Sequence, residues 1–275
     1  MTGTGLMFTA SDGAKLCYDD EGSGAPALLV HGYSANRKFW PFQRRALLDA
    51  GYRVITIDQR NHGDSEQVSF GQRMSRHGTD LRDLMDGLRL TDVTLIGHSM
   101  GVSASLALFS LHGTRDVSRF VAIDQSPKII NDEDWTWGVF GVEWPLAWAQ
   151  ANMRHPWGEL GREPVVPEHV ALEMAKVTPH HHSFPQDSFP HEQVTGLLMD
   201  HFVADWRDVL PRIDIPTWVV TGRHNPFYHP EGMEWFAQQV QRGSYSIFEN
   251  SGHEPHMNEA ELFNEQLLQF LRNTP

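Results

Sequence analysis

Cysteine is nearly absent from the 275-residue chain, in which Cys17 stands alone. A single cysteine excludes a disulfide within the chain and a cysteine-rich zinc site. Basic residues are also scarce, because 22 lysines and arginines stand against 35 aspartates and glutamates, a formal net charge of −13. Nucleic-acid backbones and anionic membranes bind clustered basic charge. We therefore expect neither of them as a partner.

Long apolar runs are missing as well. The most apolar stretch, Val93–Leu111, is interrupted by Gly97, His98, Ser99 and Gly101, so it does not predict a membrane span. The first residues lack the basic and apolar regions of a secretory signal. Hydrophobic residues make up 40% of the chain and charged residues 21%, which is ordinary for a globular protein. These features predict a cytoplasmic protein, monomer or homodimer, that acts on a small molecule.

Short apolar runs alternate with helix-like segments along much of the chain. Eight runs have the length and composition of strands: residues 6–9, 15–19, 27–30, 52–57, 93–97, 120–123, 218–221 and 244–248. Helical spacing recurs at residues 39–50, 75–88, 101–111, 231–241 and 260–271. Alternating units of this kind predict an α/β fold with a mostly parallel sheet and helices on both faces. Such sheets bind ligands at the carboxyl ends of their strands.

The alternation stops between residues 126 and 210, where strand-like runs disappear. Tryptophan is frequent there, at positions 135, 137, 144, 148, 157 and 206. We interpret residues 126–210 as a helical cap, or lid, inserted into one core domain formed by residues 1–125 and 211–275. Because pockets are lined mainly by apolar and aromatic groups, Trp40, Trp135 and Trp144 are candidates for lining a pocket for an apolar or aromatic substrate.

The segment Gly97–Gly101 has the pattern G-x-S-x-G. It follows a predicted strand and opens a predicted helix, which is the context of a nucleophile elbow with Ser99 as nucleophile. At the start of that helix the Met100 N–H lacks an intrahelical acceptor and is placed to bind an oxyanion. The second oxyanion donor is predicted to be the N–H of Tyr33, in the loop after an early strand.

The chain holds sixteen histidines, and the position of His253 distinguishes it from the others. It lies between the last strand and the last helix, so the nucleophile precedes the histidine as expected for this architecture. The acid has two candidate places. In the loop after the strand at 218–221, Asn225 occupies the expected acid position, and an amide cannot stabilise an imidazolium by charge. Asp124 ends the preceding core strand, and we select it as the acid.

The chain resembles proteins of the α/β-hydrolase fold over nearly its whole length. Asp58–Ser65 resembles the D-x-R-N-H-G-x-S segment of YbfF-type esterases, and Gly97–Gly101 matches their G-H-S-M-G. Asp124–Pro127 resembles their D-x-S-P, in which the aspartate is the triad acid. The resemblance implies hydrolysis of an ester or thioester without a cofactor. Val102, where a second glycine is common, departs from the pattern, as does the tryptophan-rich insertion.

The 60–65 segment of this resemblance is interpreted as structural. Its glycine and small polar residues predict a turn that supports the nucleophile elbow, and none of them is assigned a catalytic role.

Other functions stay open on the same residues. Cofactor-free dioxygenases of this fold open quinolone-type rings with a His/Asp pair, which Asp124 and His253 would supply. A haloperoxidase-like or carbon–carbon hydrolase activity needs only the same triad. A non-catalytic binding protein on a hydrolase scaffold is the third alternative, and Asn225 in the usual acid position is its only support.

A histidine cluster in the insertion raises the question of a metal. His180, His181 and His182 are consecutive and therefore point in different directions. His191 and His201 follow later in the segment, and no carboxylate cluster accompanies these five histidines. We predict no metal site there and interpret these histidines as part of a solvated lid loop.

Overall fold

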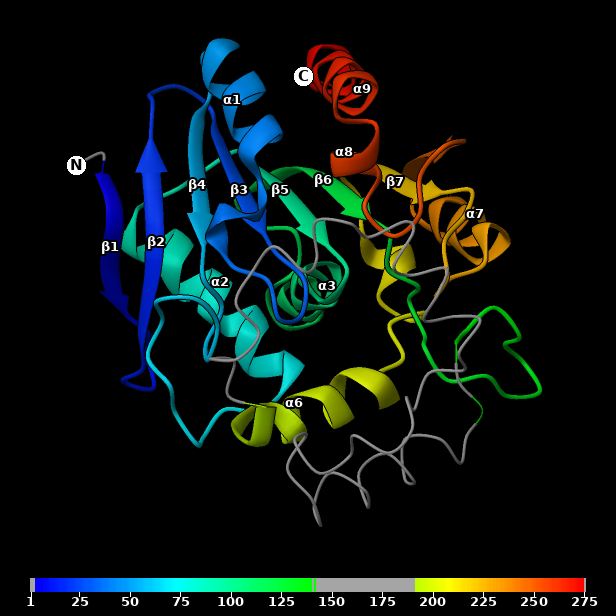
Figure 1. The fold of residues 1–275 in the computed structure, drawn as a ribbon, viewed down its shortest axis with the longest axis horizontal. Coiled ribbons are helices and arrows are strands. Elements are labelled where there is room, and N and C mark those ends of the chain that lie inside the picture. The colour runs from blue at the N-terminus through cyan, green and yellow to red at the C-terminus, as the bar shows by residue number, and fades with distance from the viewer. Residues whose placement is uncertain (1–2, 140, 142–190, 275) are drawn as a thin grey trace.

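A computed structural model describes residues 3–139, 141 and 191–274 of the chain. Its centre is one eight-stranded sheet with the strand order β1-β2-β4-β3-β5-β6-β7-β8 (Figure 1). The strands are β1 (Gly3–Thr9), β2 (Lys15–Glu21), β3 (Pro26–Val30), β4 (Arg53–Ile57), β5 (Val93–His98), β6 (Val117–Ile123), β7 (Pro216–Gly222) and β8 (Arg242–Phe248). All eight predicted strands are present.

The sheet is mostly parallel, as predicted. β2 pairs antiparallel with both β1 and β4, while every pair from β4 to β8 is parallel. Every residue of β5 and β7 is buried. Strands covered on both faces are apolar throughout instead of alternating, which explains why these segments read as short apolar runs.

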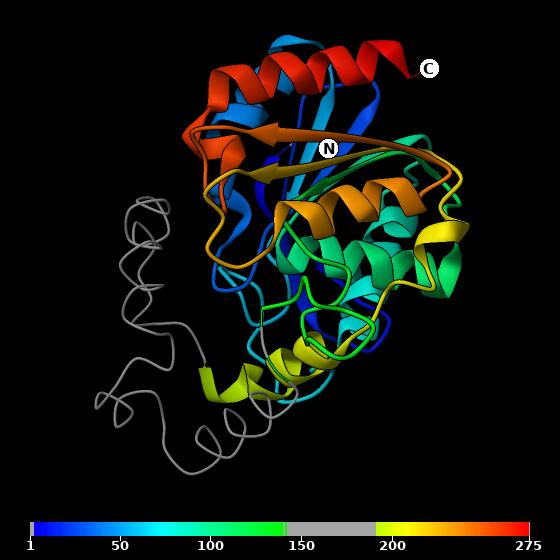
Figure 2. The ribbon, with the colours of Figure 1, turned by 90° about the vertical axis from the view of Figure 1, so that its right-hand side faces the viewer.

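Helices cover both faces of the sheet. The helices in the described part of the chain are α1 (Pro41–Asp49), α2 (Met74–Gly87), α3 (Met100–His112), α6 (His191–Val203), α7 (Pro230–Gln239), α8 (Pro255–Asn258) and α9 (Ala260–Asn273), with short 3-10 helices η1 (Arg37–Phe39) and η4 (Leu210–Arg212). Figure 2 shows α9 above the sheet and α3 and α7 below it. The five predicted helices are therefore present, with ends shifted by a few residues.

Two hydrophobic cores result from this layering. The larger core joins one face of the sheet to α2, α3 and α7 through residues such as Leu84, Leu106 and Phe236. The other joins the opposite face to α1 and α9 through residues such as Leu47 and Leu267. With the sheet fixed between two helical layers, the loops at the carboxyl ends of β3, β5, β6 and β7 share one edge.

The described part of the insertion contains α6, which lies on the side of the molecule away from α9 (Figures 1 and 2). Asp200 of α6 accepts a hydrogen bond from the Met74 N–H at the start of α2, at 2.7 Å. Lys128 and Asp205 form an isolated antiparallel bridge where the chain leaves and re-enters the core. The boundaries 126–210 stay a prediction, and Trp144, Trp148, Trp157 and residues 180–182 lie outside the described part.

No helix in the described ranges is both long and apolar enough to cross a lipid bilayer.

Candidate active site

Ser99 occupies a sharp turn between β5 and α3. Its φ of 51° and ψ of −126° lie outside the regions that non-glycine residues favour, so the turn carries backbone strain. The Ser99 N–H donates to the Ile123 carbonyl at 2.9 Å, and its carbonyl accepts from the Val102 N–H at 2.8 Å. The surrounding residues are buried while Ser99 stays partly exposed. The turn therefore presents this hydroxyl outward, as a nucleophile requires.

The glycines around Ser99 are required by close backbone contacts. A Cβ on Gly101 would lie 2.1 Å from the Val30 carbonyl oxygen, and one on Gly97 would lie 2.8 Å from the Gly101 backbone. A Cβ on Gly32 would lie 3.0 Å from the Ser99 Cβ. These contacts bring the loop after β3 against the nucleophile turn.

We expect the Gly101→Ala substitution to destabilise the protein by about 2–3 kcal/mol or more, because the methyl group would overlap a carbonyl in a packed core. The measurement is the urea midpoint of unfolding. Gly87→Ala is the matched control, since no atom lies within 4 Å of a Cβ placed there at the end of α2. Equal midpoints for the two variants would contradict the packing argument.

Asp124 and His253 are in direct contact, as a catalytic acid and base would be. The His253 Nδ1 and the Asp124 Oδ2 are 2.7 Å apart. Asp124 is fully buried and follows the last residue of β6, whereas His253 lies in the loop between β8 and α8. Because the carboxylate accepts the Nδ1 proton, the Nε2 of the imidazole is left to act as a base.

The second carboxylate oxygen of Asp124 is also hydrogen-bonded. The Thr221 hydroxyl donates to Oδ1 at 2.5 Å, and the Asn225 side-chain amide donates to it at 2.7 Å. Burial raises the pKa of Asp124, and the hydrogen bonds from His253, Thr221 and Asn225 lower it again in part. The predicted acid, Asp124, therefore directly follows β6, and Asn225 in the loop after β7 is a donor to it.

His98 places the loop that carries His253. Its Nε2 donates to the His253 backbone carbonyl at 2.9 Å, and the centres of the two rings lie 4.7 Å apart. Because His98 directly precedes Ser99, this contact brings the histidine loop to the nucleophile turn. Sequence reasoning assigned no role to His98, although its place inside the G-x-S-x-G pattern was a usable signal.

The loop after β3 contains Tyr33, the predicted second oxyanion donor. His31 is fully buried, donates from Nδ1 to the Gly32 carbonyl at 2.7 Å and accepts the Gln59 N–H on Nε2 at 3.1 Å. These bonds hold the Gly32–Tyr33 peptide next to Ser99. Met100 begins α3, so its N–H is one of the donors without an intrahelical acceptor. Both predicted donors thus border Ser99, the predicted nucleophile.

Asp58 and Gln59, which directly follow β4, support the loop after β3, while the support of the elbow by residues 60–65 stays a prediction. The Gln59 side chain donates to the His31 carbonyl at 2.6 Å, and Asp58 binds Arg37 of η1 through both its backbone N–H and its guanidinium. Arg60 is fully buried and pairs with Asp80 of α2 at 2.7 Å. The hydrogen bonds and ion pairs of Asp58, Gln59 and Arg60 thus connect the loop after β3 and α2 to this segment.

Of the three tryptophans predicted to line a pocket, two are buried in the core and one lies outside the described residues. Trp40 is 1% exposed, and its ring lies tilted against the His256 ring in the core that α1 covers, which makes it a packing residue here. Trp135 is 2% exposed and packs edge-on against Trp235, with its indole N–H donating to the Lys128 carbonyl. Trp144 lies outside the described residues.

Phe227 borders the site although no sequence signal singled it out. Its ring meets the His253 ring edge-on at 4.8 Å, and it is partly exposed. It follows Asn225 in the β7–α7 loop, so the same loop supplies a donor to the acid and an apolar wall beside the base.

His201 corrects the interpretation of a solvated histidine loop. It is 5% exposed on α6, and burial lowers its pKa to about 4. It is a neutral core residue and not a solvated one.

In the described ranges, one group of potential metal ligands gathers, namely Cys17, Asp58 and Asp64. Arg37 already lies among them, with ion pairs to both aspartates. Burial also raises the pKa of the Cys17 thiol to about 11, which disfavours a thiolate ligand. The arrangement is an ion-pair cluster.

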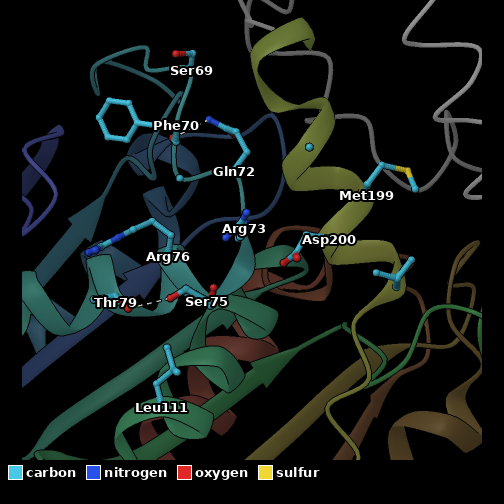
Figure 3. Close-up of a pocket in the computed structure, with 13 residues that line it drawn as sticks. Ser69, Phe70, Gln72, Arg73, Ser75, Arg76, Thr79, Leu111, Met199 and Asp200 are labelled. Atoms are coloured by element: carbon cyan, nitrogen blue, oxygen red, sulfur yellow. Dashed lines mark hydrogen bonds between the residues drawn. The ribbon is translucent and has the colours of Figure 1, made fainter.

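A hollow of about 1060 Å³ opens between α2, α6 and the segment before α2 (Figure 3). Phe70, Leu111 and Met199 contribute apolar surface, and Arg73 contributes charge. Ser99, Asp124 and His253 are not among its lining residues, so this hollow is separate from the candidate active site.

Comparison with known proteins agrees with the predicted fold. Residues 27–266 match the model of the alpha/beta hydrolase family, and the chain belongs to that family. An esterase from Exiguobacterium antarcticum has the same fold, with a TM-score of 0.82 and 24% identity over 98% of this chain and all of that one. A thermophilic esterase from Thermogutta terrifontis has a TM-score of 0.79 and 26% identity over 98% of each chain.

Sequence similarity also extends to halogenating enzymes. A non-heme chloroperoxidase, CPO-A1, from Kitasatospora aureofaciens is 37% identical over 128 residues, which cover 46% of each chain. The matched segment therefore spans about half the length of that protein.

Proposed function

We propose that the protein is a serine hydrolase that cleaves a carboxylic ester or thioester of an apolar or aromatic small molecule. The observation that carries the proposal is the strained, partly exposed Ser99 beside a buried Asp124–His253 pair. Strain at a non-glycine residue persists where the surrounding structure enforces it, typically at functional sites. Similarity to two esterase structures and to the motifs of YbfF-type esterases supports the same reaction.

In the proposed reaction the Ser99 hydroxyl attacks the carbonyl carbon of the ester while His253 takes its proton. The N–H groups of Met100 and Tyr33 bind the oxyanion that develops on the carbonyl oxygen. Asp124 holds the imidazole by its Nδ1–H and stabilises the imidazolium. The imidazolium then gives its proton to the leaving alcohol or thiol, and water releases the acid from the acyl-serine by the same steps. No cofactor enters this scheme.

The first experiment is labelling with a fluorophosphonate and identification of the modified peptide by mass spectrometry. We expect labelling of wild type at Ser99. In Asp124→Asn the labelling rate is expected to fall by roughly 10³–10⁴-fold. The amide has no negative charge to stabilise the imidazolium, and it favours the wrong tautomer of His253. The thermal midpoint of the variant serves as a folding control. A folded wild type that is not labelled would remove the proposal.

A haloperoxidase-like activity is a second candidate, favoured by the similarity to the non-heme chloroperoxidase. The same acyl-serine reacts with hydrogen peroxide in place of water, which releases a peroxy acid and restores the serine hydroxyl. The peroxy acid then oxidises halide to hypohalous acid and is itself reduced to the carboxylic acid. This candidate predicts halogenation that requires both a carboxylic acid and hydrogen peroxide and that is lost in Ser99→Ala.

A further inference from the structure

We propose that Asn225 is a positioning residue for the catalytic acid: its amide N–H keeps the Asp124 carboxylate ionised and aims Oδ2 at His253. The inference rests on the proposed function, because it assigns Asp124 as the triad acid. Asn225 stands in the loop after β7, where an acid was expected from the sequence. Its amide lies 2.7 Å from Asp124 Oδ1.

The orientation of the Asn225 amide is determined by its other contacts. Its carbonyl oxygen accepts the N–H groups of Phe227 at 2.8 Å and Tyr228 at 3.2 Å. Both of these partners are donors, so the oxygen must face them and the NH₂ group must face Asp124. The side-chain carbonyl of Asn225 thus forms hydrogen bonds within its own loop, and its NH₂ group donates to Asp124. Asn225 therefore bridges its loop and the acid.

The two oxygens of Asp124 have different partners as a result. Oδ1 accepts from Thr221 and Asn225, and Oδ2 accepts from His253. A hydrogen bond from a neutral donor to a buried carboxylate stabilises its charged form without competing for the imidazole proton.

The other titratable groups near Asp124 do not replace this donor. Tyr228 packs beside the pair, and burial and the Asp124 charge raise its pKa. Tyr228 directs its hydroxyl to Gln125, while Tyr245 of β8 directs its hydroxyl to the Pro230 carbonyl. Arg223 lies on the exposed side of the same loop and pairs with Glu249. The neutral donors Thr221 and Asn225 therefore carry the hydrogen bonding of Oδ1.

The Asn225→Asp substitution separates the two ends of the bridge. A carboxylate oxygen still accepts the N–H groups of Phe227 and Tyr228, so the loop is kept. The other oxygen faces Asp124 without a proton to donate. Two carboxyl groups in contact cannot both ionise easily, so the pair holds one proton at low pH and loses it as the pH rises. When protonated, the carboxyl at position 225 donates to Asp124 as the amide does.

The readout is the ratio of kcat/KM, variant to wild type, from pH 6 to pH 9. The ratio removes the pH dependence that the two enzymes have in common. We expect a ratio that falls to about one tenth or less at pH 9 and rises toward one as the pH is lowered. Asn273→Asp, at the exposed end of α9, adds the same charge outside the site and should keep a ratio near one. A ratio that is flat with pH, whether near one or uniformly low, overturns the proposal.

A second measurement keeps this inference distinct from the proposed function. Labelling of wild type at Ser99 tests the hydrolase proposal itself. The far-downfield proton NMR signal of the His253 Nδ1–H reports the contact with Asp124 without any substrate. We expect this signal in wild type at pH 9 and its shift or loss in Asn225→Asp. An unchanged signal in the variant overturns the role of Asn225, whether or not wild type hydrolyses esters.

Discussion

Replacing Ser99 with alanine is expected to lower ester hydrolysis by roughly 10⁴-fold or more, because the residue supplies the atom that forms the covalent intermediate. The alanine methyl fits the same turn, so the fold should be retained. Steady-state turnover of an activated ester and the burst of the first turnover measure the loss. Ser75→Ala, on the exposed surface of α2, is the matched control and should retain activity.

The same variant separates the hydrolase from the dioxygenase alternative. Ring opening by a His/Asp pair does not use an acyl-serine, so Ser99→Ala would then keep turnover while His253→Ala would lose it. The structure supplies the pair but also a strained serine directly before a helix, which a dioxygenase does not need. Undiminished turnover in Ser99→Ala would transfer the proposal to the dioxygenase chemistry.

The second large effect is expected in mild acid. Burial lowers the pKa of His31 and His201 to about 4 and of His62 and His256 to about 3. In the unfolded chain such groups titrate near pH 6.5. Below that pH the unfolded state binds protons that the folded state cannot. The free energy of unfolding is therefore highest above about pH 6.5 and decreases as the pH falls toward the folded-state pKa values of about 4 and 3. At pH 5.5 each of these histidines lowers the free energy of unfolding by about 1.4 kcal/mol relative to neutral pH.

Four such groups together remove on the order of 5 kcal/mol of unfolding free energy between pH 7.5 and pH 5.5. A domain of this kind has about 5–15 kcal/mol in total. Urea unfolding at several pH values measures the loss, and the slope gives the number of protons taken up. Buried carboxyl groups with raised pKa, such as Asp58 and Asp80, oppose the trend in part.

His256→Phe isolates one of these groups. Neither ring nitrogen of His256 has a hydrogen-bond partner among the described residues, and the ring packs against Phe39 and Trp40. Phenylalanine keeps the aromatic contacts and removes the titration. We expect a pH dependence shallower by one proton, with a stability gain that grows as the pH falls. A slope equal to that of wild type would show that His256 takes up no proton on unfolding.

The fold was predictable because local signals agreed with one another. Buried parallel strands are apolar on both faces, so β5, β6 and β7 appear in the sequence as short uninterrupted runs. The G-x-S-x-G pattern could be placed because it lies between such a run and a helix. Ser99, Asp124 and His253 could be selected from the position of each at the end of a strand.

Contacts between distant segments were not predictable in the same way. The sequence does not distinguish a tryptophan in the core from one that lines a pocket. Only the packing of Trp40 against His256 places Trp40 in the core. The acidic run at 132–134 forms a turn, since Asp132 pairs with Lys128 and bridges to Trp135. The donor role of Asn225 depends on a partner 101 residues away.

The backbone at the site also has a consequence for how this protein evolves. Ser99 and Asp124 both hold a positive φ, at 51° and 55°, at the ends of neighbouring strands. Glycine would relax either position, so selection for stability alone would remove both side chains. In the proposed function, both side chains are retained for catalysis at a cost in stability. A lineage that lost its substrate would be expected to lose these two residues early, while the buried strands that carry them stayed intact.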